Sequence, residues 1–174
     1  DMPTSRGLGD VYKRQINNPA ANTWDLESLP ALEAVVNELN GMANVRALVI
    51  TGQGEKFFSA GADLNQFASG DPVAAGAMGD AFGAAFETLA DYRGVSIAAI
   101  NGYAMGGGLE VALACDIRIA ESHAVLALPE ARVGLLPCAG GTQRLAQLVG
   151  EGWAKRMILC GERVSAEKAM TLSL

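Results

Sequence analysis

The chain has 174 residues, 50% of them hydrophobic and 18% charged, and it carries a formal net charge of −6 with a pI near 4.8. This composition is typical of a folded globular domain and argues against intrinsic disorder. The acidic balance argues against nucleic acid or an anionic membrane as the main partner, because both need a basic face, and no apolar run approaches transmembrane length.

The cysteines and the single histidine give little support for a metal site or a disulfide framework. Cys115, Cys138 and Cys160 are scattered singly, without a C-x-x-C pair. Cys138 could meet His123 in space as a nucleophile and its base, but cysteine is more commonly an apolar packing residue. His123 lies in a polar turn, so we expect it at the surface. A reducing, cytoplasmic setting fits this pattern best.

Both ends of the chain have an unusual composition. The segment Ser5–Gln15 (SRGLGDVYKRQ) resembles a translated sequencing adapter, and the final Leu172–Leu174 matches the same adapter read from the other strand. We therefore set residues 1–15 apart as a non-native segment and expect residues 172–174 to be adapter-derived as well. Residues 16–171 are then expected to be the core domain, cut from a longer natural protein.

The first half of the core domain alternates between helical and extended patterns. Apolar residues recur at helical spacing over Asp25–Gly41, with an aspartate that can cap the start and a glycine that can end the helix. The β-branched run 45–51 predicts a covered strand. Residues 73–92 predict an alanine-rich helix, and the side chains expected on its apolar face are Phe82, Phe86 and Leu89.

The stretch Asn101–Asp116, NGYAMGGGLEVALACD, is central to the sequence. It follows an apolar strand at 96–100, and residues 109–115 are typical of a helix, so we expect strand, glycine turn and helix. The glycines 106–108 remove every Cβ where the helix begins, so a ligand can approach N–H groups that lack a partner within the helix. Glu110 falls in the first turn, where a carboxylate is as consistent with a dipole-matched surface residue as with a catalytic group.

The rest of the chain continues the alternation. The sequence predicts, in order, strands at 117–120 and 124–128, a turn at Pro129–Glu130, a loop over 134–142, and short helices at 142–149 and 153–159. No linker, low-complexity segment or repeat interrupts these elements. One α/β domain is therefore the expected organisation.

Two nucleotide-binding motifs fail on spacing. After the glycines of 52–56, a phenylalanine stands where the third glycine of a dinucleotide fingerprint belongs, and Gly108 stands where a Walker loop needs lysine. What remains is two glycine and alanine turns with the carboxylates Glu110 and Glu130. Each carboxylate follows a strand, where α/β proteins place active-site groups, although each is also compatible with a surface glutamate. Brought together by the fold, they could activate a water and supply a proton.

Three blocks resemble, in the right order, the signatures of the enoyl-CoA hydratase or crotonase superfamily. They are FFSAGADL (57–64), SIAAINGYAMGGGLEVALACDIRIA (96–120) and LPEARVGLLPCAGGTQRL (128–145), and the similarity extends over residues 16–171. The resemblance implies an α/β fold with a spiral of ββα units, assembled as trimers or hexamers. It also implies acyl-CoA thioester substrates, so that coenzyme A enters as part of the substrate and no separate cofactor or metal is expected.

The resemblance also implies roles for particular residues. The two backbone N–H groups that hold the thioester oxygen map to Ala62 and Gly107, and the two catalytic glutamates of the hydratases match Glu110 and Glu130. Their joint presence favours syn hydration of a trans-2-enoyl-CoA to 3-hydroxyacyl-CoA. An enoyl-CoA isomerase or another acyl-CoA lyase is the enzyme alternative, and an inactive acyl-CoA-binding or assembly module is the non-enzyme alternative. The expected substrate contacts are Ala60, Asp63, Leu64 and Gly106.

The sequence departs from the family pattern at two points. Cys138 stands where the PGAGG-type loop usually has glycine, which is expected to alter the shape of the acyl pocket. At Gly106 and Gly107, which keep the pattern, an added side chain is expected to crowd the thioester. The family's C-terminal helical region is missing. We therefore expect uncovered apolar faces on the sheet and on the helices at 74–89 and 153–159, non-specific association, and little activity on crotonyl-CoA.

Overall fold

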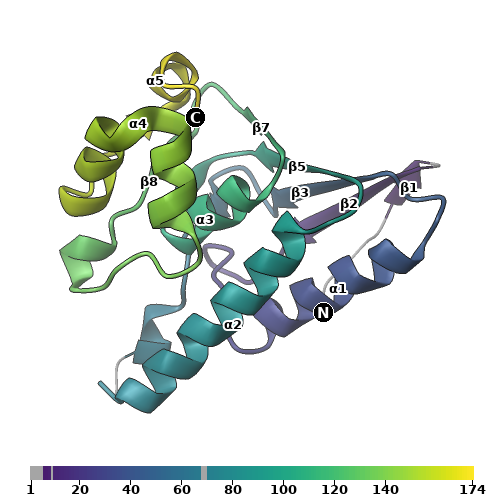
Figure 1. Ribbon diagram of the computed structural model, residues 1–174, viewed down its shortest axis with the longest axis horizontal. Helices are drawn as coiled ribbons and strands as arrows, with labels where there is room; N and C mark the ends of the chain where they lie inside the picture. Colours follow the sequence, from purple (N-terminus) through teal and green to yellow (C-terminus); the bar gives the residue numbers. More distant parts are fainter. Residues whose placement is uncertain (1–5, 9, 68–69) are drawn as a thin grey trace.

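Two β-sheets and the helices between them form the framework of the computed structural model, which describes residues 6–8, 10–67 and 70–174 (Figure 1). The five-stranded sheet has the order β1-β2-β3-β5-β7 and is parallel except at β1, and the four-stranded sheet has the order β4-β6-β8-β9 and is parallel except at β9. The strands are β1 (Arg6–Leu8), β2 (Val11–Ile16), β3 (Ala47–Gly52), β4 (Phe57–Ser59), β5 (Val95–Ile100), β6 (Tyr103–Met105), β7 (Ile117–Ala120), β8 (Val125–Ala127) and β9 (Val164–Ser165).

Successive ββα units connect the two sheets. In each unit one strand joins the five-stranded sheet, the next joins the four-stranded sheet, and a helix follows, as in β3–β4–α2 and β5–β6–α3. This confirms the predicted α/β spiral of ββα units. The helical segments are α1 (Ser28–Gly41), α2 (Pro72–Ala90), α3 (Gly107–Ala114), α4 (Gly141–Leu159) and α5 (Ala166–Thr171), with 3-10 turns η1 (Leu64–Phe67) and η2 (Glu130–Val133).

Most of the predicted elements are present within a few residues of their expected limits. Asp25 precedes α1, and its Oδ1 accepts hydrogen bonds from the Ser28 N–H at 2.7 Å and the Glu27 N–H at 3.1 Å, so the predicted cap is confirmed. The helices expected at 142–149 and 153–159 form one element, α4, which is interrupted at Gly150 by a non-helical backbone (φ 77°, ψ 161°). The sequence did not predict the short strands β6 and β9 or the helix α5.

Part of the segment that we set apart at the N-terminus, residues 6–8 and 11–15, takes part in the sheet. Strand β2 pairs in parallel with β3 from Val11↔Ala47 to Ile16↔Gly52, and Tyr12 packs against the core. Backbone hydrogen bonds between strands form with many different side chains, so an atypical sequence does not prevent pairing. Residues 11–15 therefore belong to the described sheet, while the adapter origin of the segment and the limits of the core domain stay predictions.

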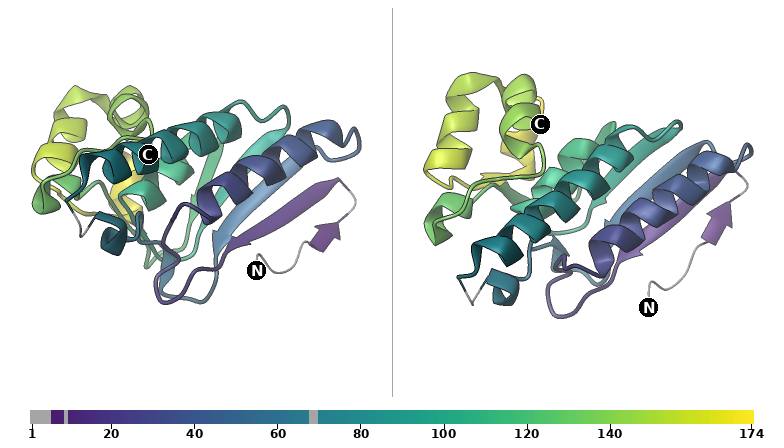
Figure 2. Two further views of the ribbon diagram at one scale, coloured as in Figure 1. Left: turned by 90° about the horizontal axis from the view of Figure 1, so that it is seen from below. Right: turned by 60° about the horizontal axis from the view of Figure 1, so that its bottom comes forward.

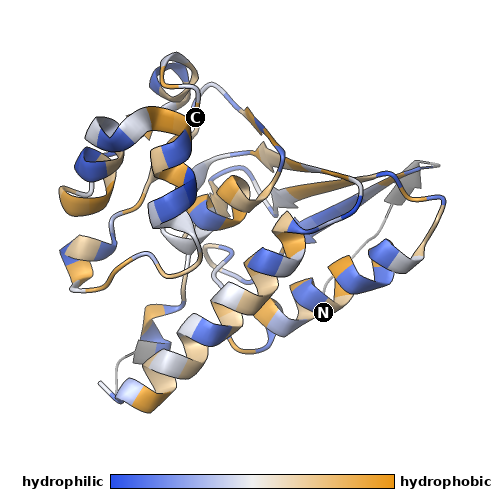
Figure 3. Ribbon diagram, in the orientation of Figure 1, coloured by the Kyte–Doolittle hydropathy of each residue, from blue (hydrophilic) through white to orange (hydrophobic). Residues whose placement is uncertain are grey.

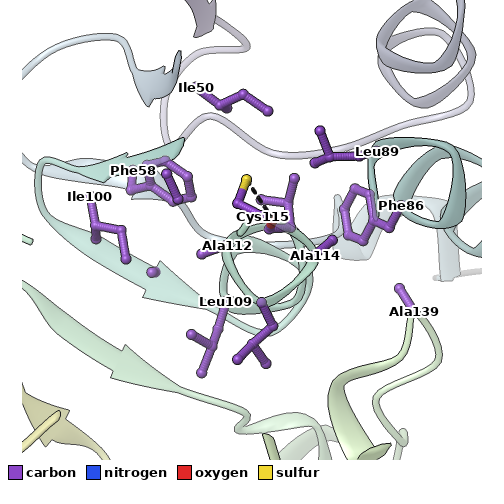
Figure 4. Close-up of a cluster of buried hydrophobic side chains, with 14 of the residues drawn as sticks. Ile50, Phe58, Phe86, Leu89, Ile100, Leu109, Ala112, Ala114, Cys115 and Ala139 are labelled. Carbon is purple, nitrogen blue, oxygen red and sulfur yellow. Dashed lines mark hydrogen bonds between the residues drawn. The ribbon is translucent and has the colours of Figure 1, made fainter. Parts of the chain in front are cut away.

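The core lies between the five-stranded sheet and the helices α1, α2 and α3. Helices α1 and α2 run side by side over one face of the sheet (Figure 2), and blue and orange residues alternate along both, as expected for helices with one buried side (Figure 3). All eight residues of α3 are buried, and Phe86, Leu89 and Ile50 lie close to this helix in Figure 4. A charged residue on α3 must therefore be buried within the molecule.

The opposite face of the five-stranded sheet leaves apolar side chains exposed. Val95, Ile117 and Ile119 are exposed, because alternate residues of a strand point to opposite faces and the helices cover only one of them. The predicted uncovered face of the sheet is confirmed. The expectation for the helix at 74–89 is wrong, because Phe82 and Phe86 are buried and pack edge-to-face on each other.

We expect Gly83→Ala to stabilise the fold by roughly 0.5–1 kcal/mol, because Gly83 lies inside α2 and an added Cβ would have no neighbour within 4 Å. Gly61→Ala is the contrasting variant. Gly61 has φ +89°, and its Cβ would lie 2.7 Å from the Met105 carbonyl oxygen, so this variant should be destabilised. Urea unfolding of both variants would measure the effects, and equal stability of the two would contradict the described backbone.

Candidate active site

Two tight turns meet at the carboxyl ends of the neighbouring strands β4 and β6. Parallel strands in an α/β sheet bring their carboxyl ends to one edge, which is where ligands commonly bind. A Cβ on Gly61 would lie 3.0 Å from the Gly107 backbone nitrogen, so the two turns pack backbone against backbone. The signature blocks 57–64 and 96–120 are thereby joined into one site.

Each turn carries a backbone N–H group that has no backbone acceptor among the described residues. Trp24 and Ala62 form a parallel bridge in which the Trp24 N–H donates to the Gly61 carbonyl at 2.8 Å and the Asp63 N–H donates to the Trp24 carbonyl at 2.9 Å. Both bonds to Trp24 are made by Gly61 and Asp63, the residues on either side of Ala62. In such a parallel bridge the N–H of Ala62 itself points away from Trp24. Gly107 is the first residue of α3, where N–H groups have no acceptor within the helix. Within the described part of the chain, neither of the two N–H groups has a backbone acceptor.

The glycines at the start of α3 are required by packing within the protein. Gly106 has φ 54° and ψ −126°, and a Cβ there would lie 2.9 Å from Glu130 Oε1. A Cβ on Gly107 would lie 2.7 Å from a ring carbon of Phe82, and one on Gly108 would overlap the Ser59 carbonyl oxygen. Because Glu130 and Phe82 themselves line the cavity described below, the expectation that side chains at Gly106 and Gly107 crowd the thioester stays a prediction.

Glu110 is a buried carboxylate on α3 with fixed geometry. Its side chain is 2% exposed, and Oε1 accepts hydrogen bonds from the Ala139 N–H at 2.8 Å and the Gly141 N–H at 2.9 Å. Burial raises the pKa of Glu110, while these N–H groups and the positive charge of Arg144 act in the opposite direction. The carboxylate is thus held by the loop that precedes α4, which excludes the alternative that Glu110 is a surface residue.

Glu130 lies at the first residue of η2, and its carboxylate is poorly solvated. Its Oε2 is buried and has no hydrogen-bond partner among the described residues. Burial, and to a smaller extent the negative charge of Glu110, raise the pKa of Glu130 to about 7. A carboxyl group with this pKa is partly protonated at neutral pH, so it can either donate or accept a proton.

A cavity of about 440 Å³ joins the two turns and the two carboxylates. All of the predicted site residues line it except Asp63, whose Oδ1 accepts hydrogen bonds from the Asn65 N–H at 3.0 Å and from Asn65 Nδ2 at 2.8 Å. Asp63 therefore shapes the turn that follows Ala62. The predicted residues that line the cavity are Ala60, Ala62, Leu64, Gly106, Gly107, Glu110 and Glu130.

The sequence analysis missed part of the lining. Phe82 was predicted only as a core residue of α2, and it lies between the core and the cavity. The loop residues carried no periodic signal, and only their place in the third signature block pointed to the site. The further lining residues are Thr23, Phe82, Pro129, Arg132, Val133, Leu135 and Leu136, together with Cys138, which was already expected at the acyl pocket.

The cysteines and the histidine do not form a nucleophilic pair. Cys138 lines the cavity and is exposed, so its expected role as a packing residue is wrong. His123 lies at the surface, as predicted, with a ring nitrogen 3.3 Å from the Glu55 carbonyl oxygen and outside the cavity. Cys115 is the buried thiol, in van der Waals contact with the core.

The described residues contain neither a cluster of metal ligands nor a membrane-spanning helix. No three His, Cys, Asp or Glu side chains in residues 6–8, 10–67 and 70–174 gather as metal ligands would. Over the same ranges, no helix combines the length and the apolar character needed to cross a bilayer.

Comparisons with known proteins place these features in a family. A family model described as "Enoyl-CoA hydratase/isomerase" matches residues 8–174. The chain is 38% identical to the short-chain-enoyl-CoA hydratase of Clostridium acetobutylicum over 167 residues, covering 95% of this chain and 64% of that protein. It is 41% identical to the 2,3-dehydroadipyl-CoA hydratase of Escherichia coli over 162 residues, covering 91% of this chain and 62% of that protein.

Solved structures show the same relationship. Pseudomonas aeruginosa DspI superposes with a TM-score of 0.96 at 65% identity, covering 98% of this chain and 70% of that one. An enoyl-CoA hydratase from Bacillus anthracis gives a TM-score of 0.94 at 38% identity, covering 99% of this chain and 67% of that one. The chain thus spans less than two thirds of the two curated relatives, at 64% and 62% of their lengths. The chain therefore belongs to the enoyl-CoA hydratase/isomerase family, the crotonase superfamily, as shown by its three signature blocks, its spiral of ββα units and these matches.

Proposed function

We propose that the protein is an enoyl-CoA hydratase, which adds water to a trans-2-enoyl-CoA and gives the 3-hydroxyacyl-CoA. The observation that carries the proposal is the meeting of Glu110, Glu130 and two unpartnered backbone N–H groups around one cavity. Relatives named as hydratases support it. Coenzyme A would enter as part of the substrate, and the chemistry needs no metal or separate cofactor.

The backbone N–H groups of Ala62 and Gly107 are the proposed donors to the thioester oxygen. Negative charge develops on this oxygen when water adds to the β-carbon. One preorganised donor of this kind is worth about 3 kcal/mol of transition-state stabilisation. Gly107 also lies at the positive end of the α3 dipole, which favours the same charge. The packing of Gly61 against Gly107 would keep the two donors in place.

The two carboxylates are proposed to divide the proton transfers. Glu110 has one oxygen fixed by two N–H groups, so its other oxygen can accept a proton from the attacking water. Glu130, with a pKa raised to about 7 and an unpartnered Oε2, can deliver a proton to the α-carbon. The family resemblance implies that hydrogen and hydroxyl add to the same face of the double bond, a syn addition, which requires both carboxylates to face one side of the bound enoyl group.

The products formed from two substrates would separate the proposal from its alternatives. A hydratase converts a 2-enoyl-CoA into a 3-hydroxyacyl-CoA, whereas an isomerase converts a 3-enoyl-CoA into the 2-enoyl-CoA without gain of water. Chromatography with mass detection identifies each product. We expect the hydroxyacyl product from the 2-enoyl substrate. Isomerised product alone would favour the isomerase, and tight binding without any product would favour an inactive acyl-CoA-binding or assembly module.

We expect kcat/KM for hydration to fall as the pH rises through about 7, because burial raises the pKa of Glu130 to about that value and only the protonated acid can donate. Well above this pH, the decline should approach tenfold for each further pH unit. A pH profile of kcat/KM on crotonyl-CoA, which reports the free enzyme, would measure it. A rate that stays level from about pH 6 to about pH 9 would rule out Glu130 as the acid.

The assembly and setting are proposed from the family and from the surface. A homotrimer or hexamer would cover the exposed Val95, Ile117 and Ile119 on the open face of the sheet. The three cysteines are free thiols, which supports a reducing, cytoplasmic setting. Light scattering at several protein concentrations would test the assembly.

A further inference from the structure

One wall of the cavity is apolar and exposed to solvent. Leu64, Val133 and Leu136 line the cavity with exposed fractions of 55%, 55% and 71%, although large apolar side chains are usually buried. Leu64 belongs to η1, whereas Val133 and Leu136 belong to η2 and the loop after it, so this wall comes from two separate segments. Apolar side chains that gather around a concave site mark a surface for an apolar ligand group.

The charged groups of the cavity are confined to one part of it. The charged residues among those that line it are Glu110, Glu130 and Arg132. The Arg132 side chain is directed away from the apolar wall. Its Nη2 donates to the Cys160 carbonyl at 3.4 Å, and its Nε would lie 2.6 Å from a Cβ on Gly161. The guanidinium thus lies against the turn that follows α4. No cation among the lining residues faces the apolar wall.

Cys138 lies where the apolar wall meets the carboxylates. It immediately precedes Ala139, whose N–H holds Glu110, and its side chain lines the cavity together with both glutamates. Although the residue as a whole is exposed, its thiol is partly desolvated at the cavity, and this burial and the charges of Glu110 and Glu130 raise its pKa to about 11, so the thiol stays uncharged at neutral pH. It therefore contributes volume beside the reacting carbons without adding charge.

We infer that the acyl group bound here is an uncharged aliphatic chain longer than crotonyl, lying on the wall of Leu64, Val133 and Leu136, with Cys138 as a specificity-determining residue beside the carboxylates. This inference rests on the proposed function, whose substrate class it narrows. An acyl chain that ends in a carboxylate, such as the dehydroadipyl chain named for one relative, would find no cation on this wall. Such a carboxylate has to stay hydrated, so the end of that chain cannot lie on the apolar wall and should gain nothing from its extra length.

Binding of saturated acyl-CoA esters tests the apolar wall without relying on turnover. Each buried methylene contributes about 0.8 kcal/mol, which is about fourfold in affinity. With partial burial of four added methylenes, octanoyl-CoA should bind about tenfold or more tighter than butyryl-CoA by calorimetry. Adipyl-CoA should bind no tighter than butyryl-CoA. Equal affinity of adipyl-CoA and octanoyl-CoA would overturn the inference.

A matched pair of variants locates the effect on the wall. Leu136→Ser should lower the affinity for octanoyl-CoA about fivefold and leave butyryl-CoA unchanged, because it removes apolar surface along the chain. Leu159→Ser is the control, since Leu159 is similarly exposed, at 64%, and lies on α4 outside the lining of the cavity. Both side chains are exposed, so neither variant should affect folding. An equal effect of the two variants on octanoyl-CoA would contradict the inference.

Variants of Cys138 test the specificity-determining role. Cys138→Gly should shift the ratio of kcat/KM for 2-octenoyl-CoA over crotonyl-CoA upward by about tenfold, and Cys138→Leu should shift it downward, on the scale of one methylene in a pocket. Cys160→Leu, at an exposed cysteine outside the cavity, is the control. Unchanged ratios in both Cys138 variants would exclude the role. If the esters bind in the expected order and none is hydrated, the proposed function fails alone; if crotonyl-CoA is hydrated and the order is absent, the inference fails alone.

Discussion

Glu130→Gln is expected to lower kcat for hydration by about 100-fold or more, with acyl-CoA affinity nearly unchanged. The amide keeps the shape of the side chain and cannot donate a carboxylic proton. Oε2 of Glu130 has no hydrogen bond to lose among the described residues, so the change should leave the cavity intact. Loss of kcat without loss of affinity is the signature of a group that acts in the transition state.

Steady-state kinetics on crotonyl-CoA and calorimetry with a saturated ester would measure the two quantities for Glu130→Gln. Glu121→Gln is the matched control, because Glu121 is an exposed glutamate in the turn between β7 and β8 and outside the cavity. The control should retain the parental rate. Turnover of Glu130→Gln close to that of the parent would remove Glu130 from the mechanism.

Glu110→Gln should also lower kcat by about 100-fold or more, for a different physical reason. The amide oxygen can still accept the N–H groups of Ala139 and Gly141, so the loop before α4 should keep its place. A neutral amide cannot take a proton from water. Binding of the ester should therefore survive while the chemical step fails.

Glu110→Ala separates the catalytic and the structural contribution of this residue. It would leave the Ala139 and Gly141 N–H groups buried without an acceptor, which costs about 1–3 kcal/mol for each group. Thermal unfolding should therefore show a loss of stability in Glu110→Ala that Glu110→Gln lacks. If both variants unfold like the parent and hydrate crotonyl-CoA at its rate, Glu110 has neither role.

Periodic and local signals in the sequence were sufficient for much of the fold. The helix over 73–92 and the strand at 96–100 appear as α2 and β5, because both are long enough to show their apolar period. The short strand β6 was missed within the glycine stretch. It has three residues, and its pairing with β4 and β8 comes from distant parts of the chain. Such non-local pairing leaves no signal in the local sequence.

The sequence predicted most residues of the candidate site, but it did not predict their burial or their contacts. Glu110 was equally consistent with the surface and with a cleft, and only the complete burial of α3 decides between them. Packing adds a second reason for Gly107, since the contact that a Cβ would make with Phe82 involves two elements far apart in sequence. The wall formed by Val133 and Leu136 was not predicted either, because loop residues show no apolar periodicity.

Hydration carried out in D₂O tests the central claim most directly, that two carboxylates on one cavity add water to a thioester held by two backbone N–H groups. Nuclear magnetic resonance of the 3-hydroxyacyl product gives the configuration of deuterium at C2 relative to the hydroxyl at C3. Fixed carboxylates in one cavity predict a single diastereomer, and the proposed syn addition predicts that both groups are added to the same face. Addition to opposite faces, a mixture of diastereomers, or no hydroxyacyl product from a protein that binds the ester would contradict it.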